Sequence, residues 1–554
     1  MKKIISLFIL CSLSALAWGQ GTLTGDLMMN LNFFQSDPAI NANNDLYNKY
    51  LSGSEGWLGL RYNNKGFTVF VRADAFNNSN LKVPASVNTN FGIGAWSVSK
   101  DFSGLSITAG YIYDQVGSGI LFRSYEDRGL LIDNALVGFE LKYKLTDHIM
   151  LKGLTGQQKK NSLDNNQDVL SQRYAPVVRV INAEGDFHIG KAQLSPGLGV
   201  LNRTLDQSTM DAIVGTLDAL PLSQRFEPMY NMYAFTAYNL LTLGSLTWYA
   251  EGAYKTHEAI ADPSGTLVDK PGNVEYTSIG YARKGLAINL NGKRTDAFVM
   301  RVTPIINPTT PSDGTLNWQP IIAIIRPGRL MSRYTPASED YSEMAGTANV
   351  LVSPSDNLSL AFTGTTINTL DNAELYREAY CDAVYNTQGA WSFQGGIQYL
   401  EYNKTAYQVS EGISSTASLP MVKALTPFAE ATYKISTKKS LRMELEYMST
   451  KEDYGSWVYA ILEYNLAPKW SISAADMYNI TPNKNSDNPN FNTLTNSVPD
   501  QGHHYYNIYT AYTKGPHRFA IAYVKQVDGI NCAGGVCRYE PAFSGVKATI
   551  TSSF

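Results

Sequence analysis

The densest cluster of polar residues in the sequence lies between residues 113 and 134. The tripeptide Gly117-Ser118-Gly119 interrupts an apolar strand pattern there. Charged residues of both signs surround it: Asp114, Arg123, Glu126, Asp127, Arg128 and Asp133. Charges that are buried or half-buried must pair with one another. The pattern therefore predicts a loop that folds inward, narrows a lumen and is held to the wall by arginine–carboxylate pairs.

Two roles remain open for these charges. They could form a ring that selects among ions passing a constriction. Alternatively, they could form a purely structural network of ion pairs, and this is the favoured interpretation. In both interpretations the six charged residues are candidates for lining a lumen constriction.

A second segment, residues 297–340, is rich in arginine and poor in acids. Only Asp313 opposes the arginines before Glu339 is reached, and the segment also contains the apolar run 321–325. A loop of this length with its own apolar run should pack against something. It could fold inward as an anion-attracting constriction, fold outward to meet anionic surface lipid, or form two further strands. The arginines are Arg301, Arg326, Arg329 and Arg333.

Cysteine and histidine residues offer little catalytic chemistry. Cys532 and Cys537 are separated by four residues that include two glycines, which predicts a loop disulfide in an oxidising compartment. A zinc site would need more ligands than this loop holds, and Cys381 is expected to be unpaired. The sequence has six histidines, and spacing singles out no serine or aspartate partner for any of them. We expect no enzyme activity, no metal and no cofactor.

The elements that must position these residues are strands. Apolar and polar residues alternate in 67–76, 135–145 and 457–466, so each strand has one apolar and one polar face. Charged residues make up only 17% of the chain, and no apolar run after the first 20 residues is long enough for a spanning helix. Together these features predict an all-β protein, a transmembrane antiparallel β-barrel.

We expect about 24 strands, within a range of 22 to 26, since barrels of this class usually have an even number. Short turns such as 63–66 and 467–469 alternate with long polar connections, which is the asymmetry of a membrane barrel. A barrel this wide is not filled by wall side chains, so something should fold inward. The expected long loops are 35–56, 113–133, 159–177, 203–228, 257–272, 297–340, 404–424, 481–502 and 528–542.

The two ends predict the cellular compartment. Residues 1–19 combine a positive start, an apolar core and small residues, as a secretory signal peptide does, so 20–554 would be the barrel. We expect strands to begin directly after it, without a separate plug or periplasmic domain. The last ten residues alternate and end in Phe554, which resembles the insertion signal of Gram-negative outer-membrane barrels. The expected partners are outer-membrane lipid, the assembly machinery through Phe554, and an envelope protein that the sequence does not identify, but no nucleic acid.

The segment DQVGSGILFRSYEDRGLLIDNAL, residues 114–136, carries a family resemblance. It resembles the signature of an uncharacterised outer-membrane β-barrel family of the Bacteroidota, whose members share the Gly-Ser-Gly and Arg-Ser-Tyr-Glu-Asp-Arg pattern. The resemblance implies the compartment and the fold, but no activity. The sequence thus predicts a passive channel or loop-occluded transporter for small hydrophilic solutes. A non-conducting barrel that serves as a scaffold or subunit of an envelope complex is the alternative, and a barrel-embedded enzyme comes third.

Overall fold

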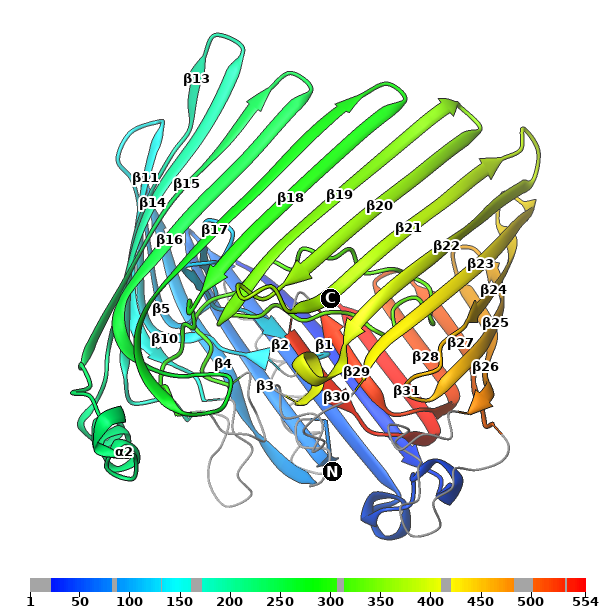
Figure 1. Cartoon of the computed structure of the whole chain (residues 1–554), viewed down its shortest axis with the longest axis horizontal. Helices are drawn as coiled ribbons and strands as arrows, with labels where there is room; N and C mark the ends of the chain where they lie inside the picture. The colour runs from blue at the N-terminus through cyan, green and yellow to red at the C-terminus, as the bar shows by residue number, and fades with distance from the viewer. Residues whose placement is uncertain are drawn as a thin grey trace.

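A computed structural model describes residues 21–81, 87–130, 132–160, 172–305, 313–409, 420–482, 502–533 and 536–554. Within these residues one antiparallel sheet closes on itself as a barrel (Figure 1). It has 24 wall strands when β12 and the short β13, both paired with β14, are counted as one. The prediction of an all-β barrel of about 24 strands is confirmed.

The wall strands follow one another around the barrel in chain order. Their bounds are β1 (Thr22–Phe34), β2 (Ser52–Asn64), β3 (Phe67–Ser79), β4 (Asn88–Phe102), β5 (Leu105–Ile112), β10 (Leu136–Lys144), β11 (Ile149–Gln158), β12 (Val177–Gly185), β13 (Phe187–Ile189), β14 (Ala192–Thr204), β15 (Asn231–Leu243), β16 (Leu246–Ala261), β17 (Leu267–Arg283), β18 (Leu286–Asp296), β19 (Ser342–Ser355), β20 (Leu358–Asn368), β21 (Glu374–Asn386), β22 (Trp391–Asn403), β23 (Met421–Ser436), β24 (Lys439–Met448), β25 (Gly455–Leu466), β26 (Trp470–Pro482), β27 (His504–Lys514), β28 (His517–Gln526) and β31 (Phe543–Ser553).

The barrel is closed by pairing between the first and last strands. β1 and β31 pair antiparallel from Asp26 opposite Ser553 to Phe34 opposite Gly545. Beyond that ladder, the backbone of Gly25 both donates to and accepts from the backbone of Phe554, at 2.7 and 3.0 Å. Closure leaves no open sheet edge, which is what a barrel in hydrocarbon requires. The last strand therefore pairs with the first, as a closed barrel requires.

Side chains alternate between a lipid-type exterior and a covered interior. Ile181 and Leu198 are 67% and 64% exposed on the outside, whereas Val180 and Leu201 are 1% and 0% exposed. The strands carry β-branched and aromatic residues at the outward positions, where such residues suit a pleated surface. On β3 the outward Val69 and Val71 alternate with inward, buried Arg72. Apolar residues therefore cover the outside, while charges face the lumen.

Connections differ at the two ends of the barrel, as the sequence predicts. Short turns join the strands at the upper end in Figure 1, and long connections lie at the lower end. One long connection carries the outlying helix α2 (Gln207–Asp218), capped by the Asp206 side chain. Another holds η1 (Pro38–Ile40) and η2 (Leu46–Tyr50). Two further short helices among the described residues are η4 (Leu222–Gln224) and η5 (Thr405–Val409). Within the described ranges, no helix is long and apolar enough to cross a membrane.

One expected loop is mostly strand. The sequence suggests a loop at 257–272, but β16 and β17 continue to pair there, from Glu258 opposite Lys270 to Ala261 opposite Leu267. The ladder resumes after an irregularity between Lys255 and Glu258, so only a tight turn remains. The physical reason is that the main-chain hydrogen bonds of a hairpin can continue beyond the barrel wall.

Apolar side chains also pack inside the barrel. One group joins residues of β10 to β17 to two connections that enter the lumen, and includes Ile120, Leu121, Phe122 and Phe298. A larger group joins β19 to β27 to the second of these connections, and includes Ile322, Leu330 and Tyr334. The core therefore consists of inward connections packed on the inner wall.

Candidate functional site: a lumen closed by two inward loops

The first inward loop comprises residues 113–135, between β5 and β10. Two small hairpins shape it, namely β6 (Gln115–Val116) with β7 (Phe122–Arg123), and β8 (Glu126–Asp127) with β9 (Ile132–Asp133). Gly117 and Gly119 have φ values of +54° and +101°, which side chains rarely adopt. These two residues form the tip that the Gly-Ser-Gly motif predicts, and the loop folds inward as expected.

Apolar anchors hold the tip of this loop against the wall. Val116, Ile120, Leu121 and Phe122 are 0 to 1% exposed. A Cβ atom on Gly199 of β14 would lie 2.8 and 2.9 Å from the Leu121 and Val116 side chains, so a glycine is needed there. Each fully buried large apolar side chain contributes roughly 1.5 to 3 kcal/mol. The loop tip is thus fixed by packing as well as by charge.

A buried charge cluster fixes the other end of the loop. Arg72 of β3 lies 2.7 Å from Asp74, 2.9 Å from Glu126 and 2.6 Å from Asp133, measured between charged atoms. Lys159, beyond β11, lies 2.5 Å from Asp133. Burial alone would raise the pKa of Asp133, but the positive charges of Lys159 and Arg72 lower it. The carboxylate therefore stays ionised and holds the loop to β3.

The remaining charged residues of the loop have different surroundings. Asp114 lies 2.7 Å from Lys142 of β10 and 2.8 Å from Lys152 of β11. Burial would raise its pKa, but hydrogen bonds from Glu140 and Lys142 and the charge of Lys152 lower it. Arg128 lies 2.8 Å from Glu126 and 3.3 Å from Asp26 of β1.

Two of the predicted residues make no ion pair in the described part of the chain. The Arg123 guanidinium lies over the rings of Tyr125 and Trp318, at 4.3 and 4.9 Å from their centroids. Asp127 accepts a hydrogen bond from the backbone N–H of Leu130 at 2.9 Å, which closes a turn. The first loop is therefore held by four of its six charged residues, while aromatic contacts hold Arg123.

The second inward loop comprises residues 297–341, between β18 and β19. Of the three predicted alternatives, the structure shows the inward one, and the described residues contain no further wall strands. The apolar run is the reason, because Ile322 and Ala323 are 4% and 7% exposed among wall residues of the larger apolar group.

Three of the four arginines of this loop bind groups of the loop itself or of the wall. The Arg326 guanidinium donates to both carboxylate oxygens of Glu378 on β21, at 2.9 and 3.1 Å. Arg333 lies 3.5 Å from Asp453 and packs over the rings of Tyr454 and Trp457. Arg301 donates to the carbonyl of Asp313 at 3.2 Å, within the loop.

Arg329 differs, because its side chain is exposed within the barrel and no ion pair joins it to a described residue. Although its side chain is exposed to the lumen, Arg329 lies deep inside the barrel, and this desolvation, followed by the charge of Arg333, lowers its pKa. Next to it, the Glu446 carboxylate of β24 accepts the backbone N–H groups of Arg329, Leu330 and Met331 at 2.6, 3.0 and 3.2 Å. Arg329 is therefore the one arginine of this loop, among those the structure describes, that is available to a solute.

The two inward loops are joined to each other. The backbone N–H of Arg123 donates to the Leu316 carbonyl, and that of Trp318 donates to the Gly119 carbonyl, both at 3.0 Å. The Asn317 side chain adds a hydrogen bond to the Ile120 carbonyl at 3.0 Å. Because each loop is also fixed to a different part of the wall, together they form one partition across the lumen, visible inside the barrel in Figure 1.

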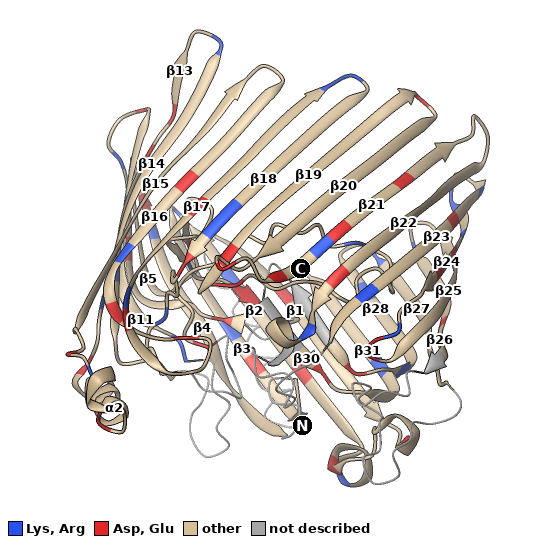
Figure 2. Ribbon diagram, in the orientation of Figure 1, with Lys and Arg blue, Asp and Glu red and all other residues tan. Residues whose placement is uncertain are grey.

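The wall residues that hold the partition escaped the sequence-based site prediction. They are Arg72, Asp74, Lys142, Lys152, Lys159, Glu378, Glu446 and Asp453. Most of them lie on wall strands, and charged residues are sparse along these strands (Figure 2). A charge at an inward position of an alternating strand is a signal that could have identified several of them.

The structure describes only the backbone around the predicted disulfide. β29 (Gly529–Ala533) and β30 (Val536–Glu540) form a hairpin whose register sets Cys532 directly opposite Cys537. The side chains of both lie outside the described residues, so the disulfide stays a prediction. Cys381 is a free thiol, as expected. Residues 1–20 also lie outside the described ranges, and the signal peptide remains a prediction.

The fold and the partition define the class: a wide β-barrel with an apolar exterior and a lumen occluded by its own loops. Over residues 1–554 the chain matches the Family of unknown function (DUF6029), and it belongs to that family. This confirms the expectation of an uncharacterised family. No curated protein matches the sequence.

Solved structures similar to this chain are outer-membrane receptors and transporters of low sequence identity. The ferric enterobactin receptor of Pseudomonas aeruginosa is 10% identical, with a TM-score of 0.40, covering 97% of this chain and 81% of that one. The siderophore receptor PirA of Pseudomonas aeruginosa gives the same four values. The iron transporter FrpB of Neisseria meningitidis is 9% identical, with a TM-score of 0.39, covering 96% of this chain and 82% of that one.

Proposed function

We propose that the protein is a loop-occluded channel for small hydrophilic solutes in the outer membrane of a Gram-negative bacterium. The observation that carries the proposal is the partition: two inward loops, joined by backbone hydrogen bonds, cross a wide lumen whose wall is polar. A polar lumen wall suits water and hydrophilic solutes, so a path opened past the loops would conduct them.

Some of the contacts that hold the partition are weak enough to break, so the loops can move. Arg128 and Asp26 are half-exposed and 3.3 Å apart, so they form a weak pair. The cluster around Arg72 is buried and therefore much harder to break. We infer that the resting barrel conducts poorly and that passage requires the Arg128 segment of the first loop, or the second loop, to move away from the wall.

Planar-bilayer conductance of purified protein tests the proposal. Leu136 pairs directly with Ile112, and Ser342 with Asp296, so a short turn can replace residues 114–134 or 298–340 without stretching the wall. We expect small or intermittent conductance for the wild type and large steady conductance when both loops are replaced.

The control shortens an outward connection by the same means. Asn231 pairs with Thr204, so residues 206–229, which include α2, can also be replaced by a turn. This variant should conduct like the wild type. If replacing both inward loops leaves an assembled barrel non-conducting, the channel proposal is wrong, and the non-conducting scaffold of an envelope complex becomes the better interpretation.

A further inference from the structure

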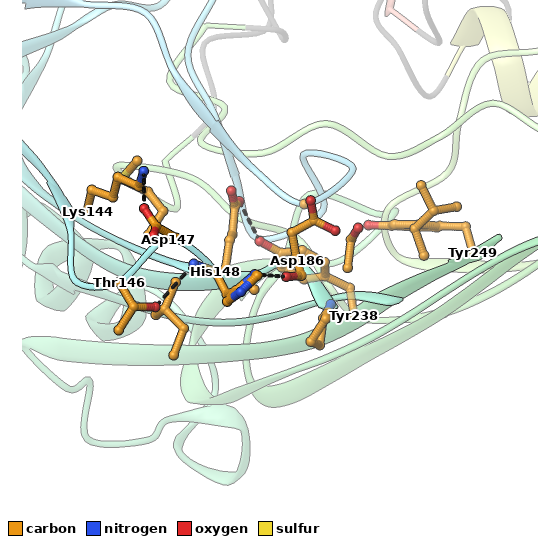
Figure 3. Close-up of a pocket in the computed structure, with 15 residues that line it drawn as sticks. Lys144, Thr146, Asp147, His148, Asp186, Tyr238 and Tyr249 are labelled. Atoms are coloured by element: carbon orange, nitrogen blue, oxygen red, sulfur yellow. Dashed lines mark hydrogen bonds and ion pairs between the residues drawn. The ribbon is translucent and has the colours of Figure 1, made fainter. Parts of the chain in front are cut away.

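A cavity of about 470 Å³ opens on the lumen side of the wall, next to the tip of the first inward loop. The turn after β10 borders it on one side, strands β12 and β14 to β16 form its wall, and Gly117 lies at its edge. Figure 3 shows Lys144 and Asp147 at one end of the lining group, with His148, Asp186 and Tyr238 following toward Tyr249. Its size is within the range of small-molecule sites, roughly 300 to 1,000 Å³.

Two tyrosine rings form one side of this cavity. The rings of Tyr238 and Tyr249 have centroids 6.4 Å apart and planes inclined by 32°. The Tyr238 hydroxyl donates to Glu184 at 2.7 Å, and the Tyr249 hydroxyl donates to Glu251 at 2.6 Å. Both rings are therefore fixed in orientation.

Glycines make room for the tyrosine pair. A Cβ atom on Gly197 would lie only 2.1 Å from the Tyr238 ring, so no other residue fits beneath it. A Cβ atom on Gly117 would lie 3.0 Å from both Glu251 and Tyr238, and its φ is +54°. The loop tip thus approaches the ring pair closely and holds Glu251 through the Ser118 backbone N–H at 3.0 Å.

The charge around the rings is negative. Lys144 and Asp147 neutralise each other at 2.7 Å. Glu184 and Asp186 have hydrogen-bond donors, Tyr238 and Gln193, but no cationic partner among the described residues. Buried Glu251 is likewise satisfied by uncharged donors alone, namely Ser118, Thr236 and Tyr249. Three carboxylates therefore lie in or beside the cavity, and none of them forms an ion pair with a described cation.

We propose that this cavity binds a small organic cation, a solute whose ammonium group lies between the tyrosine rings and the carboxylates of Glu184 and Asp186. Aromatic faces and carboxylates attract a cation together, since the negative face of the ring and the formal charges act in the same direction. An anionic solute would be repelled by the same carboxylates. The proposed site deepens the proposed function by naming a class of solute. It rests on that function only for the route by which the solute passes the barrel.

Isothermal titration of purified barrel with choline tests the site, with glucose and succinate as neutral and anionic comparators. We expect choline to bind and the other two to give no signal. Glu184→Gln and Asp186→Asn, made singly and together, should weaken choline binding, by tenfold or more for the pair. Tyr249→Leu should weaken it while leaving both carboxylates in place.

A matched control lies on another part of the wall. Asp382 of β21 accepts a hydrogen bond from Gln394 at 2.6 Å, as Asp186 does from Gln193, but it is remote from the tyrosine pair in sequence and on a different strand. Asp382→Asn should leave choline binding unchanged. A loss equal to that of Asp186→Asn would show general lumen charge rather than a site, and would overturn the inference.

The outcomes separate this inference from the proposed function. A wild-type barrel that fails to bind choline, or binds glucose equally well, overturns the cation site. If the barrel still conducts when both inward loops are replaced, the channel proposal stands even without the cation site. Choline binding to a barrel that never conducts would leave the site intact and remove the channel. Gel heat-modifiability confirms that each variant is folded before titration.

Discussion

An Nη atom of Arg72 lies 2.6 Å from an Oδ atom of Asp133, although 61 residues separate them in the chain. Arg72 belongs to the barrel wall, and Asp133 belongs to the final hairpin of the first inward loop. Both side chains are buried, and Lys159 contacts the same carboxylate. This single carboxylate therefore links the loop to two separate wall segments.

Asp133→Asn should release the first inward loop. The substitution removes the charge that Arg72 and Lys159 share, and breaking one partner of a buried pair costs about 3 to 5 kcal/mol. The wall ladder does not depend on this residue, so the barrel should still assemble. Single-channel recording should show larger or longer openings than in the wild type.

Asp127→Asn is the matched control for that variant, because it removes an equal charge from the same loop. Asp127 accepts one backbone hydrogen bond and pairs with no described cation, so the loss is about 0.5 to 1.5 kcal/mol. Its conductance should stay near the wild-type value. An equal rise in both variants would show that loop charge, and not the link to the wall, sets the openings.

Acid should loosen the second inward loop through Asp453. Burial alone would raise the pKa of this carboxyl, but the charges of Lys404 and Arg333 and the hydrogen bond from Tyr334 lower it. A carboxyl whose folded pKa lies below its unfolded value contributes stability above the unfolded value, and that stability is lost as the pH falls through the folded pKa. The part of the loop's attachment that Asp453 supplies should therefore be constant from about pH 5 to 8 and weaken only below about pH 4.

Hydrogen exchange of residues 332–337, corrected for intrinsic rates, measures this attachment. In the wild type, protection should fall only in acid, whereas Asp453→Asn should lower it already at pH 7. Residues 115–124 of the first inward loop provide the internal comparison, since Asp453 does not contact them directly, and their protection should be the same in both proteins. Full protection of 332–337 in Asp453→Asn at pH 7 would mean that Asp453 does not hold the loop.

The wall of this barrel was predictable from local sequence, because alternation reports directly which face of a strand meets lipid. In β3, for example, Val69, Val71 and Arg72 alone indicate the two faces. The inward course of the first loop was also predictable, from the Gly-Ser-Gly break. For the second loop, the apolar run 321–325 predicted packing against another part of the protein but left three courses open. Each of these signals lies within about ten neighbouring residues.

The partners of the loops were not predictable, because they depend on contacts between distant segments. Nothing near Arg326 in the sequence indicates Glu378, and nothing near Arg123 indicates that Trp318 covers it. The tyrosine pair was not predictable for the same reason, since Tyr238 and Tyr249 meet only when β15 and β16 pair. Sequence alternation gives the face of each residue, but not which residues on that face meet.

A disulfide between Cys532 and Cys537 remains a prediction that mass spectrometry can check. The β29–β30 register sets the two residues directly opposite each other, as a disulfide across this hairpin requires. An unreduced digest of protein extracted from membranes should contain the linked peptide. Cys381 is the internal control, because it is free and should be alkylated without reduction. Alkylation of all three cysteines to the same extent would contradict the prediction.

Deletion of residues 545–554 should prevent the barrel from inserting. β31 pairs with β28 on one side and β1 on the other, so its loss leaves two unpaired edges. Each unsatisfied backbone group costs several kcal/mol in hydrocarbon, and the deletion exposes a row of them on each edge. Phe554→Ala is the matched control, because it removes the terminal ring but keeps both backbone hydrogen bonds with Gly25. The deleted chain should be absent from membrane fractions or degraded. Phe554→Ala should still give a heat-shifting, membrane-integrated band on a gel, in a smaller amount because the terminal ring is the expected signal to the assembly machinery. A normal amount of that band from the deleted chain would contradict closure by β31 as the requirement for insertion.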